Sequence, residues 1–589
     1  MVAVLVALFA VASVVRGYEL RSNDATGTTP EHAPAKLHLY IDDSDKYAVA
    51  ESYLLKDRPL ATATYHQNVG NSGFNYLDIT STTPEEGALL RSTETYLSTM
   101  RAMGYLEGYL TCDEIATFYP NFYSDSFGSN VVPSDVKNFI ESNYAYALKQ
   151  AEAEANADSE YWQAIRGTLA QLNGMVEGFE GSSCAQEGGS KFTLLQALYV
   201  NAWGDLYTIQ TKFMLENATS QLLEARRRGD RNSRLKYHRA SHIPKELRCS
   251  SLFRLLPDYS DIIFGHVTWD GFEALGPRIF KRYKLPNQNS IYFSASPATI
   301  SSVDDFYVVL NEDGTTQLGV IETTNEVYNP ELFPLVQPTS VLSWMRVMVA
   351  NTLATDGPSW SQYFSTHPSG TYTNQWQVLD MNLFQSGQTI PPENLFTIVE
   401  EIPGTIVTDD LTQTLYKQTY WASYNIPYFD EIYIKSGNKA SCELGKMSSN
   451  STDNCYEDCP RANIFRDQFE TIATLSDMQY IINFNKWQTD PDSEGDPCKA
   501  IGCRKDLEPN ESSSYPAGGL DGKVSSIMKS MTKYNQDGPT IMGRVGPSDD
   551  DQPPFCWSNV QNEEEFSHFG QPNCFQYEWT SLVFSQPLR

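Results

Sequence analysis

Residues 226–251 read RRRGDRNSRLKYHRASHIPKELRCSS, and they divide the chain into two unlike parts. The stretch 226–248 contains nine Lys or Arg residues and two acidic ones, a net charge of +7. The whole chain of 589 residues has a formal net charge of −30, so the remainder carries −30 − 7 = −37. A basic stretch with Ser, Asn and Gly inside an acidic protein predicts an exposed loop that trypsin-like or furin-like proteases cut easily. We interpret 226–248 as an excised linker; the alternative is a solvated loop that stays intact.

The segments on the two sides of this linker have different hydrophobic periods. Before it, apolar residues recur every three or four positions, which predicts helices over 136–150, 161–179 and 193–213. After it, short β-branched and aromatic runs predict strands, and one further helix is expected over 341–353. Helices followed by strands predict an α+β protein. The expected strands cover 261–269, 290–296, 305–310 and 317–324.

The composition narrows the classes of function. A sequence pI near 4.6 disfavours nucleic-acid binding, which needs clustered Lys and Arg. Aromatic residues make up 12% of the chain, as in packed rather than disordered proteins. The motifs G-x-S-x-G and H-E-x-x-H and a Gly-rich phosphate loop are all missing from the sequence. The two neighbouring histidines, His238 and His242, lie in the linker, and we expect no metal site and no cofactor.

The first residues predict a secretory signal peptide. Val2–Val15 is an apolar run too short to span a bilayer, and small residues flank a cut after Gly17. A buried N-terminal strand or helix is the alternative. No later stretch reaches the roughly 18 consecutive apolar residues of a membrane helix, so we expect a lysosomal or secreted protein without a transmembrane segment. The expected parts are a signal peptide (1–17), a helix-rich fragment (18–225), the linker (226–248) and a strand-rich catalytic fragment (249–589).

Sequons and cysteines agree with an oxidising lumen. Asn-x-Ser/Thr sequons at Asn217, Asn450 and Asn510 predict N-glycosylation. Six of the ten cysteines form three pairs of near neighbours, which tend to become disulfides in such a compartment. A zinc site is the alternative, but no His lies nearby to complete a tetrahedron. The pairs are Cys498 with Cys503, Cys455 with Cys459, and Cys556 with Cys574.

Cys249 has no near neighbour, and it directly follows the basic linker. A cut between Arg248 and Cys249 gives this residue a free α-amino group with a reference pKa of roughly 7.7 to 8.0. Nucleophile and base then belong to one residue, which is the N-terminal nucleophile design. A thiol suits this role, because even partial thiolate is strongly nucleophilic. The alternative is a buried small hydrophobe, the commonest use of a lone Cys.

A series of short motifs follows in order along almost the whole chain. The first are Leu247-Arg248-Cys249-Ser250-Ser251, Leu256-Pro257-Asp258 and Phe264-Gly265-His266-Val267-Thr268-Trp269, and the others are Gly104-Tyr105-Leu106-Glu107-Gly108-Tyr109-Leu110-Thr111, Glu322-Thr323-Thr324, Asp356-Gly357-Pro358-Ser359-Trp360, Gly370-Thr371-Tyr372, Asn374-Gln375-Trp376, Tyr424-Asn425-Ile426-Pro427-Tyr428-Phe429, Pro460-Arg461-Ala462, Pro516-Ala517-Gly518-Gly519-Leu520-Asp521 and Pro553-Pro554-Phe555. In this order they closely resemble the phospholipase B-like (lamina ancestor) family.

The resemblance implies an αββα four-layer sandwich of the N-terminal nucleophile hydrolase superfamily. It implies self-cleavage before Cys249 and a lysosomal or secreted glycoprotein that releases fatty acids from glycerophospholipids. The two processed fragments are then expected to stay associated, and the substrate is a phospholipid or another acyl lipid. Related members of the superfamily cleave amides.

The resemblance also implies roles for the remaining site residues. Asn425 is expected to supply an amide to the oxyanion, and Arg461 to hold the carbonyl side of Cys249 or a head-group phosphate. His266 is expected near the α-amine, Trp269 as a wall for acyl chains, and Thr324 as a hydroxyl contact of the amine. The alternatives are a loop Asn in an Asx turn, a surface Arg, and a core His and Trp.

Two other functions stay open at this point. One is an N-acyl amide hydrolase of the ceramidase type, which uses the same nucleophile on a different leaving group. The other is a self-processed lumenal lipid-binding protein with little turnover.

Overall fold

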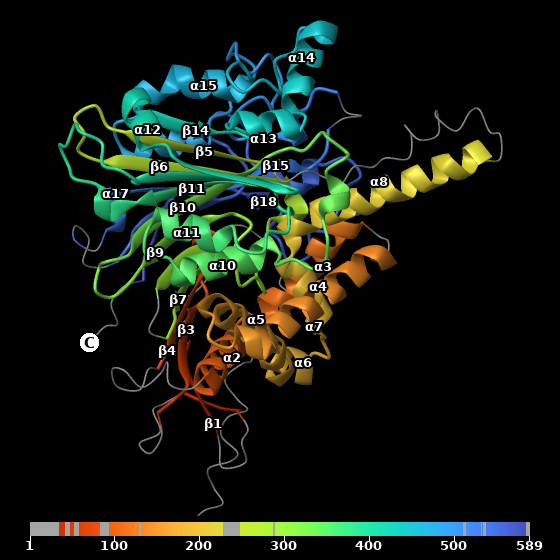
Figure 1. Cartoon of the computed structure of the whole chain (residues 1–589), viewed down its shortest axis with the longest axis vertical. Coiled ribbons are helices and arrows are strands. Elements are labelled where there is room, and N and C mark those ends of the chain that lie inside the picture. The colour runs from red at the N-terminus through yellow and green to blue at the C-terminus, as the bar shows by residue number, and fades with distance from the viewer. Residues whose placement is uncertain are drawn as a thin grey trace, which may run out of the picture. The chain divides into compact units, whose positions relative to one another are not determined.

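The structure is a computed structural model that describes most of the chain after the N-terminus (Figure 1). The described residues are 35–41, 47–51, 58–82, 93–128, 131–227, 248–286, 289–510, 514–531, 533 and 538–584, all within the unit His32–Arg589. The predicted signal peptide, 1–17, and linker residues 228–247 lie outside the described residues. Within the described part, no helix has the length and apolar character needed to cross a membrane.

The larger sheet has eleven strands in the order β13-β12-β11-β10-β9-β8-β7-β4-β3-β1-β2. Its strand pairs are antiparallel apart from β4 and β7, which run parallel. The pair β4–β7 joins the chain before the linker to the chain after it. The strands are β1 Ala35–Ile41, β2 Tyr47–Ala50, β3 Ala61–His66, β4 Phe74–Ser81, β7 Arg278–Lys284, β8 Ser290–Ala295, β9 Phe306–Leu310, β10 Gln317–Thr324, β11 Asn374–Asp380, β12 Phe396–Ile402 and β13 Thr405–Asp410.

The second sheet has six strands in the order β14-β5-β6-β15-β16-β19. It packs against the larger sheet. The ring centroids of Phe253 and Phe396 lie 4.9 Å apart, and those of Phe264 and Phe306 lie 5.5 Å apart. Every residue of β6 and β15 is buried, as expected for strands covered on both faces. The strands are β5 Arg248–Leu255, β6 Ile262–Gly271, β14 Tyr420–Ser423, β15 Ala517–Ser526, β16 Ile541–Val545 and β19 Thr580–Leu582; β17 Phe555–Cys556 and β18 Cys574–Phe575 form a separate hairpin.

Helices cover the outer face of each sheet. On the larger sheet, α11 (Gly357–Phe364) places Trp360 and Phe364 against Trp376 of β11. In the same layer, α10 (Ser343–Leu353) and α2 (Thr93–Leu110) pack on α5 (Glu160–Gly181). On the smaller sheet, α16 (Leu475–Ile482) packs so closely on β6 that a Cβ at Gly265 would lie 2.7 Å from Ile482. The predicted α+β class is therefore confirmed, with two large sheets between helices.

Most of the predicted elements are present. The helices expected over 136–150, 161–179 and 341–353 are α4 (Ser134–Glu152), α5 and α10, and the four expected strands are β6, β8, β9 and β10. The helix expected over 193–213 is instead two helices, α7 (Leu194–Asn201) and α8 (Trp203–Arg227). The break follows Asn201, whose amide donates to Ala298 O and accepts from Ile300 N, which ties the end of α7 to the sheet. The N-terminal part also contributes β1–β4, which the periodicity did not predict.

Four disulfides are present, and one predicted pair is wrong. Cys498–Cys503 and Cys556–Cys574 form as expected. Cys455 does not pair with Cys459. It pairs with Cys442 of α14 (Asn438–Ser449), whose Cα lies 4.8 Å away, because that helix folds back onto the loop. Cys459 is a buried free thiol at the start of α15 (Pro460–Gln468). The fourth disulfide, Cys112–Cys184, links α3 (Cys112–Phe127) to α6 (Ser183–Gln186).

Candidate active site

The β5–β6 hairpin brings the predicted nucleophile and two of its predicted neighbours together. Cys249 is the second residue of β5 and lies opposite Thr268, while Arg248 lies opposite Trp269. His266 lies opposite Ser251, so Cys249 and His266 are on the same face, the one directed at the larger sheet. The register of a ten-residue buried strand therefore fixes this part of the site.

Cys249 is buried in the uncut chain. Its side chain is 1% exposed, and its Sγ donates to Glu322 Oε1 of β10 at 3.9 Å. Burial raises the pKa of the thiol well above its usual range, and the Glu322 carboxyl adds to that effect. The thiol is therefore neutral in this state. Cys249 and Cys459 are the free cysteines of the described chain.

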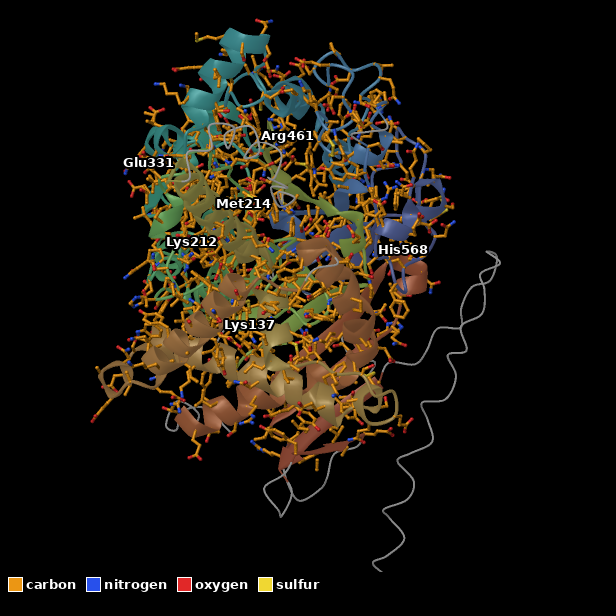
Figure 2. The ribbon with its side chains drawn as sticks, turned by 90° about the vertical axis from the view of Figure 1, so that its right-hand side faces the viewer. Lys137, Lys212, Met214, Glu331, Arg461 and His568 are labelled. Carbon is orange, nitrogen blue, oxygen red and sulfur yellow. A yellow bond between two sulfur atoms is a disulfide. The ribbon has the colours of Figure 1, made fainter. Side chains whose placement is uncertain are left out.

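Arg461, which is labelled in Figure 2, bonds to the chain at Cys249 and Ser250. It lies at the second position of α15, behind Pro460, whose fixed φ suits the first turn of a helix. Its Nη1 donates to Cys249 O at 2.9 Å and to Ser250 Oγ at 3.0 Å. The guanidinium carbon also lies 4.6 Å from the ring centroid of Trp269. The guanidinium of Arg461 therefore contacts the carbonyl side of Cys249, whereas a plain surface Arg would not.

Asn425 is connected to the same group. Its Oδ1 accepts from Arg461 Nη1 at 2.7 Å, and its Nδ2 donates to Thr324 O at 2.6 Å. The backbone of Asn425 has φ 69°, the left-handed region that Asn tolerates better than most residues. Thr324, at the end of β10, has a buried Oγ1 without a hydrogen-bond partner among the described residues. The structure thus brings together all six predicted residues around one strand end.

The surroundings of Trp269 and His266 limit the roles of these two side chains. The indole Nε1 of Trp269 donates to Ile501 O at 2.9 Å, so its ring is fixed against the guanidinium of Arg461. His266 is fully buried, and its ring nitrogens have no hydrogen-bond partner in the described chain. Burial lowers the pKa of His266 well below its usual range, which favours the neutral imidazole. The Sγ of Cys249, a ring nitrogen of His266 and a carboxylate oxygen of Glu322 lie within 4.8 Å of one another. Zinc takes ligands of these three kinds, and binding it would occupy the thiol that we expect to be the nucleophile.

Sequence reasoning missed the acidic residues behind the thiol. Tyr372 Oη lies 2.6 Å from Asp305 Oδ2 and 2.9 Å from Glu322 Oε1. Burial raises the pKa of both carboxyls. Asp305 raises the pKa of Glu322 further, and Asp304 raises that of Asp305. Glu322 and Tyr372 belong to two of the motifs quoted above, which was the signal available, but neither had an assigned role. Asp305 was only the first residue of an expected strand.

We predict that Arg461→Lys slows processing and turnover strongly. A lysine ammonium cannot reproduce the planar fork that contacts Cys249 O, Asn425 and Tyr424 O together. We expect a loss of at least tenfold in both rates, measured by gel densitometry of the cut chain and by release of fatty acid. Arg466→Lys is the matched control on the same helix, where the exposed guanidinium bonds to Glu457 O. Equal rates in Arg461→Lys and the control would contradict the role given to Arg461.

The chain is similar to known proteins over most of its length. A family model described as "Phospholipase B" matches residues 61–582. "Phospholipase B-like protein B" of Dictyostelium discoideum is 33% identical over 532 residues, covering 89% of this chain and 86% of that protein. "Phospholipase B-like 1" of Rattus norvegicus is 31% identical over 576 residues, covering 96% and 95%. "Phospholipase B-like 1" of Homo sapiens is 31% identical over 527 residues, covering 88% and 86%.

Proposed function

Because this chain belongs to the phospholipase B family, we propose that it is a lysosomal or secreted acyl hydrolase that releases fatty acids from glycerophospholipids. Its nucleophile is Cys249, exposed as an N-terminal residue by self-cleavage after Arg248. The observation that supports this most is the position of Cys249, at the start of a buried strand and directly after the basic linker. The groups around it supply an arginine clamp, an amide and carboxyls.

Maturation begins with attack of the Cys249 thiol on the carbonyl carbon of Arg248. The S–C bond forms, the C–N bond breaks, and the thiol proton ends on the departing nitrogen, which becomes the α-amine. Water then hydrolyses the thioester to a carboxylic acid and restores the thiol. Burial of Cys249 in the uncut chain keeps the nucleophile from other acyl donors until the linker leaves.

In the mature enzyme the α-amine takes the thiol proton, and Cys249 attacks the acyl carbon of the substrate. The tetrahedral oxyanion needs preorganised donors, and the loss of one such donor costs about 3 kcal/mol. The amide of Asn425 is the donor that we propose, held by Arg461 and Thr324 O. The buried hydroxyl of Thr324 faces no other partner in the described chain and is available to the α-amine.

We expect the two fragments of the mature protein to stay together without a covalent link. Cys112–Cys184 lies before the linker and the other three disulfides lie after it. Strand β4 pairs with β7 across the cut, and the buried Lys281 Nζ bonds to Glu107 Oε1 at 2.7 Å between the fragments. N-terminal sequencing and size-exclusion chromatography check this: two chains, one beginning at Cys249, should elute as one species. An active protein with Cys249 internal would contradict the proposed function.

We predict that the protein is more stable at pH 5 than at pH 7.5. Burial raises the pKa of Asp380 and of Glu400 to about 7, against about 4 in the unfolded chain. The folded state binds these protons more tightly, so its stability is greatest below pH 4 for these groups and falls as the pH rises to 7. We expect a melting temperature several degrees higher at pH 5, measured by scanning calorimetry. Asp380→Asn should reduce this pH dependence; a higher melting temperature at pH 7.5 in the wild type would contradict the prediction.

Lumenal modification is part of the same proposal. Asn217, Asn450 and Asn510 are all exposed, as glycan acceptors must be. Asn217 is on α8, and Asn450 is the C-terminal cap of α14. We propose that all three sequons carry glycans.

A further inference from the structure

Self-cleavage needs a base that the mature enzyme's mechanism does not provide. In the uncut chain the nitrogen of Cys249 belongs to the peptide bond with Arg248, so no α-amine exists to take the thiol proton. The described residues give the Cys249 Sγ one hydrogen-bond acceptor, Glu322 Oε1 at 3.9 Å. His266 is the other buried base nearby, but its ring nitrogens make no hydrogen bond in the described chain. The thiol therefore points its proton at a carboxyl.

The carboxyls of Glu322 and Asp305 share the phenol of Tyr372, and this geometry requires one of them to stay protonated. The phenol oxygen of Tyr372 lies 2.6 Å from Asp305 Oδ2 and 2.9 Å from Glu322 Oε1, and it carries a single hydrogen. A phenol can donate to only one of two acceptors. If both carboxyls were ionised, one carboxylate oxygen would lie against the phenol oxygen without a proton between them. One carboxyl of the pair therefore keeps its proton and donates to the phenol.

Neighbouring charges reinforce this arrangement. The buried cations nearby are already paired: Lys523 with Asp304 and Asp521, and Arg278 with Asp521. In the part of the chain that the structure describes, neither Asp305 nor Glu322 has an ion-pair partner. Burial accordingly raises the pKa of both, which supports the proton count. The titratable or charged groups packed around the pair are Cys249 of β5, His266 of β6, Arg278 of β7, Asp304 before β9, Tyr307 of β9, Tyr372 before β11, and Asp521 and Lys523 of β15.

We propose that Glu322 carries the thiol proton of Cys249 to the departing nitrogen during self-cleavage, while Tyr372 and Asp305 keep one further proton on the pair. The inference rests on the proposed function. Glu322 Oε1 takes the proton as the S–C bond forms, and it returns that proton to the nitrogen as the C–N bond breaks. In the resting chain Asp305 raises the pKa of Glu322, which favours the pair's proton on Glu322. The step requires that proton on Asp305, where it neither enters nor leaves the reaction. It holds Tyr372 as the donor to Glu322, so Asp305 and Tyr372 are positioning residues and Glu322 is the catalytic one.

The test is the rate at which the purified full-length chain cuts itself, followed by gel densitometry from pH 4 to pH 8. We expect Glu322→Gln to slow the cut about 100-fold or more, as loss of a general base does. In the wild type we expect the rate to rise with pH above the ordinary carboxyl range, because burial raises the pKa of Glu322. That rise should disappear in Glu322→Gln. Tyr372→Phe should move the rise to a different pH while the chain still cuts, a change that loss of packing alone does not produce.

Asp380→Asn is the matched control. Asp380 is a buried carboxyl of raised pKa on β11, opposite Leu318 rather than opposite the Glu322 end of β10. It should leave the rate of the cut unchanged. A Glu322→Gln chain that melts like the wild type and cuts at the wild-type rate would overturn the proton-carrying role. A wild-type chain that never cuts itself at Cys249 would instead overturn the proposed function, so the two failures are distinguishable.

Discussion

Cys249→Ala leaves the chain uncut and without acyl turnover. The variant keeps the backbone of β5, so we expect the fold to be retained while the group proposed to attack the Arg248 carbonyl is removed. We expect a single full-length band after any incubation, and release of fatty acid from phospholipid vesicles at least 10⁴-fold below the wild type. This is about the loss seen when a covalent nucleophile is removed. Denaturing gels and a fatty-acid assay measure the two outcomes.

Cys459→Ala is the matched control for the same experiment. Cys459 is the other buried free thiol of the described chain, and burial raises its pKa to about 11. It lies two residues before Arg461 in the sequence but donates nothing to the scissile bond, so this variant should cut and turn over like the wild type. Cys249→Ser should cut slowly, because a hydroxyl is a weaker nucleophile than a thiol. Full activity in Cys249→Ala would refute the nucleophile assignment.

Asn425→Ala should slow acyl turnover about 10²- to 10³-fold while Cys249 of the mature protein still reacts with an alkylating reagent. The oxyanion of acyl transfer needs an amide donor, and alkylation forms no oxyanion. The measurement is therefore a ratio, the rate of ester hydrolysis against the rate of labelling by iodoacetamide. An equal decrease in the rates of ester hydrolysis and of labelling would show that Asn425 positions the Cys249 thiol and does not stabilise the oxyanion.

The Asn425→Ala variant needs a control, because alanine at this position also strains the backbone. Asn425 has φ 69°, and alanine in that region costs roughly 1–2 kcal/mol. Asn394 has φ 62° and is exposed two residues before β12, so Asn394→Ala carries a similar cost away from the site. Equal losses of turnover in the two variants would assign the effect to strain.

Periodicity predicted the helices and strands whose apolar residues repeat over ten or more positions, or form continuous buried runs. The helix over 136–150 and the strand over 261–269 are examples. It missed β1 to β4, because these short strands lie at the far edge of the larger sheet and depend on β7, some 200 residues later in the chain. The break between α7 and α8 depends on contacts of Asn201 with Ala298 O and Ile300 N, which no local pattern contains.

The site was predicted unevenly for a similar reason. Cys249 was found from its place after the linker, and Arg461 and Asn425 from motifs, since each lies in a recognisable stretch. The carboxyl pair of Asp305 and Glu322 was not found, because these residues lie 17 positions apart in the sequence and both contact Tyr372, a further 50 residues along the chain. The wrong disulfide has the same origin: the partner of Cys455 is set by the fold of α14 and not by sequence distance.

The substrate class is tested by giving one enzyme preparation esters and amides that carry the same acyl chain and comparing their rates. We expect glycerophospholipid esters to acylate Cys249 faster than N-acyl amides of the same chain length. Faster turnover of the amides would favour the ceramidase-type hydrolase. A thiol that alkylates readily but is acylated by neither would favour a lipid-binding protein.

Mass spectrometry of the acyl-enzyme tests the central claim most directly. The processed protein is incubated with an activated fatty-acyl ester, quenched in acid, and digested so that each cysteine peptide is resolved. The account predicts one thioester adduct, on a peptide whose first residue is Cys249. An adduct on Cys459, or on a peptide in which Arg248 still precedes Cys249, would contradict it.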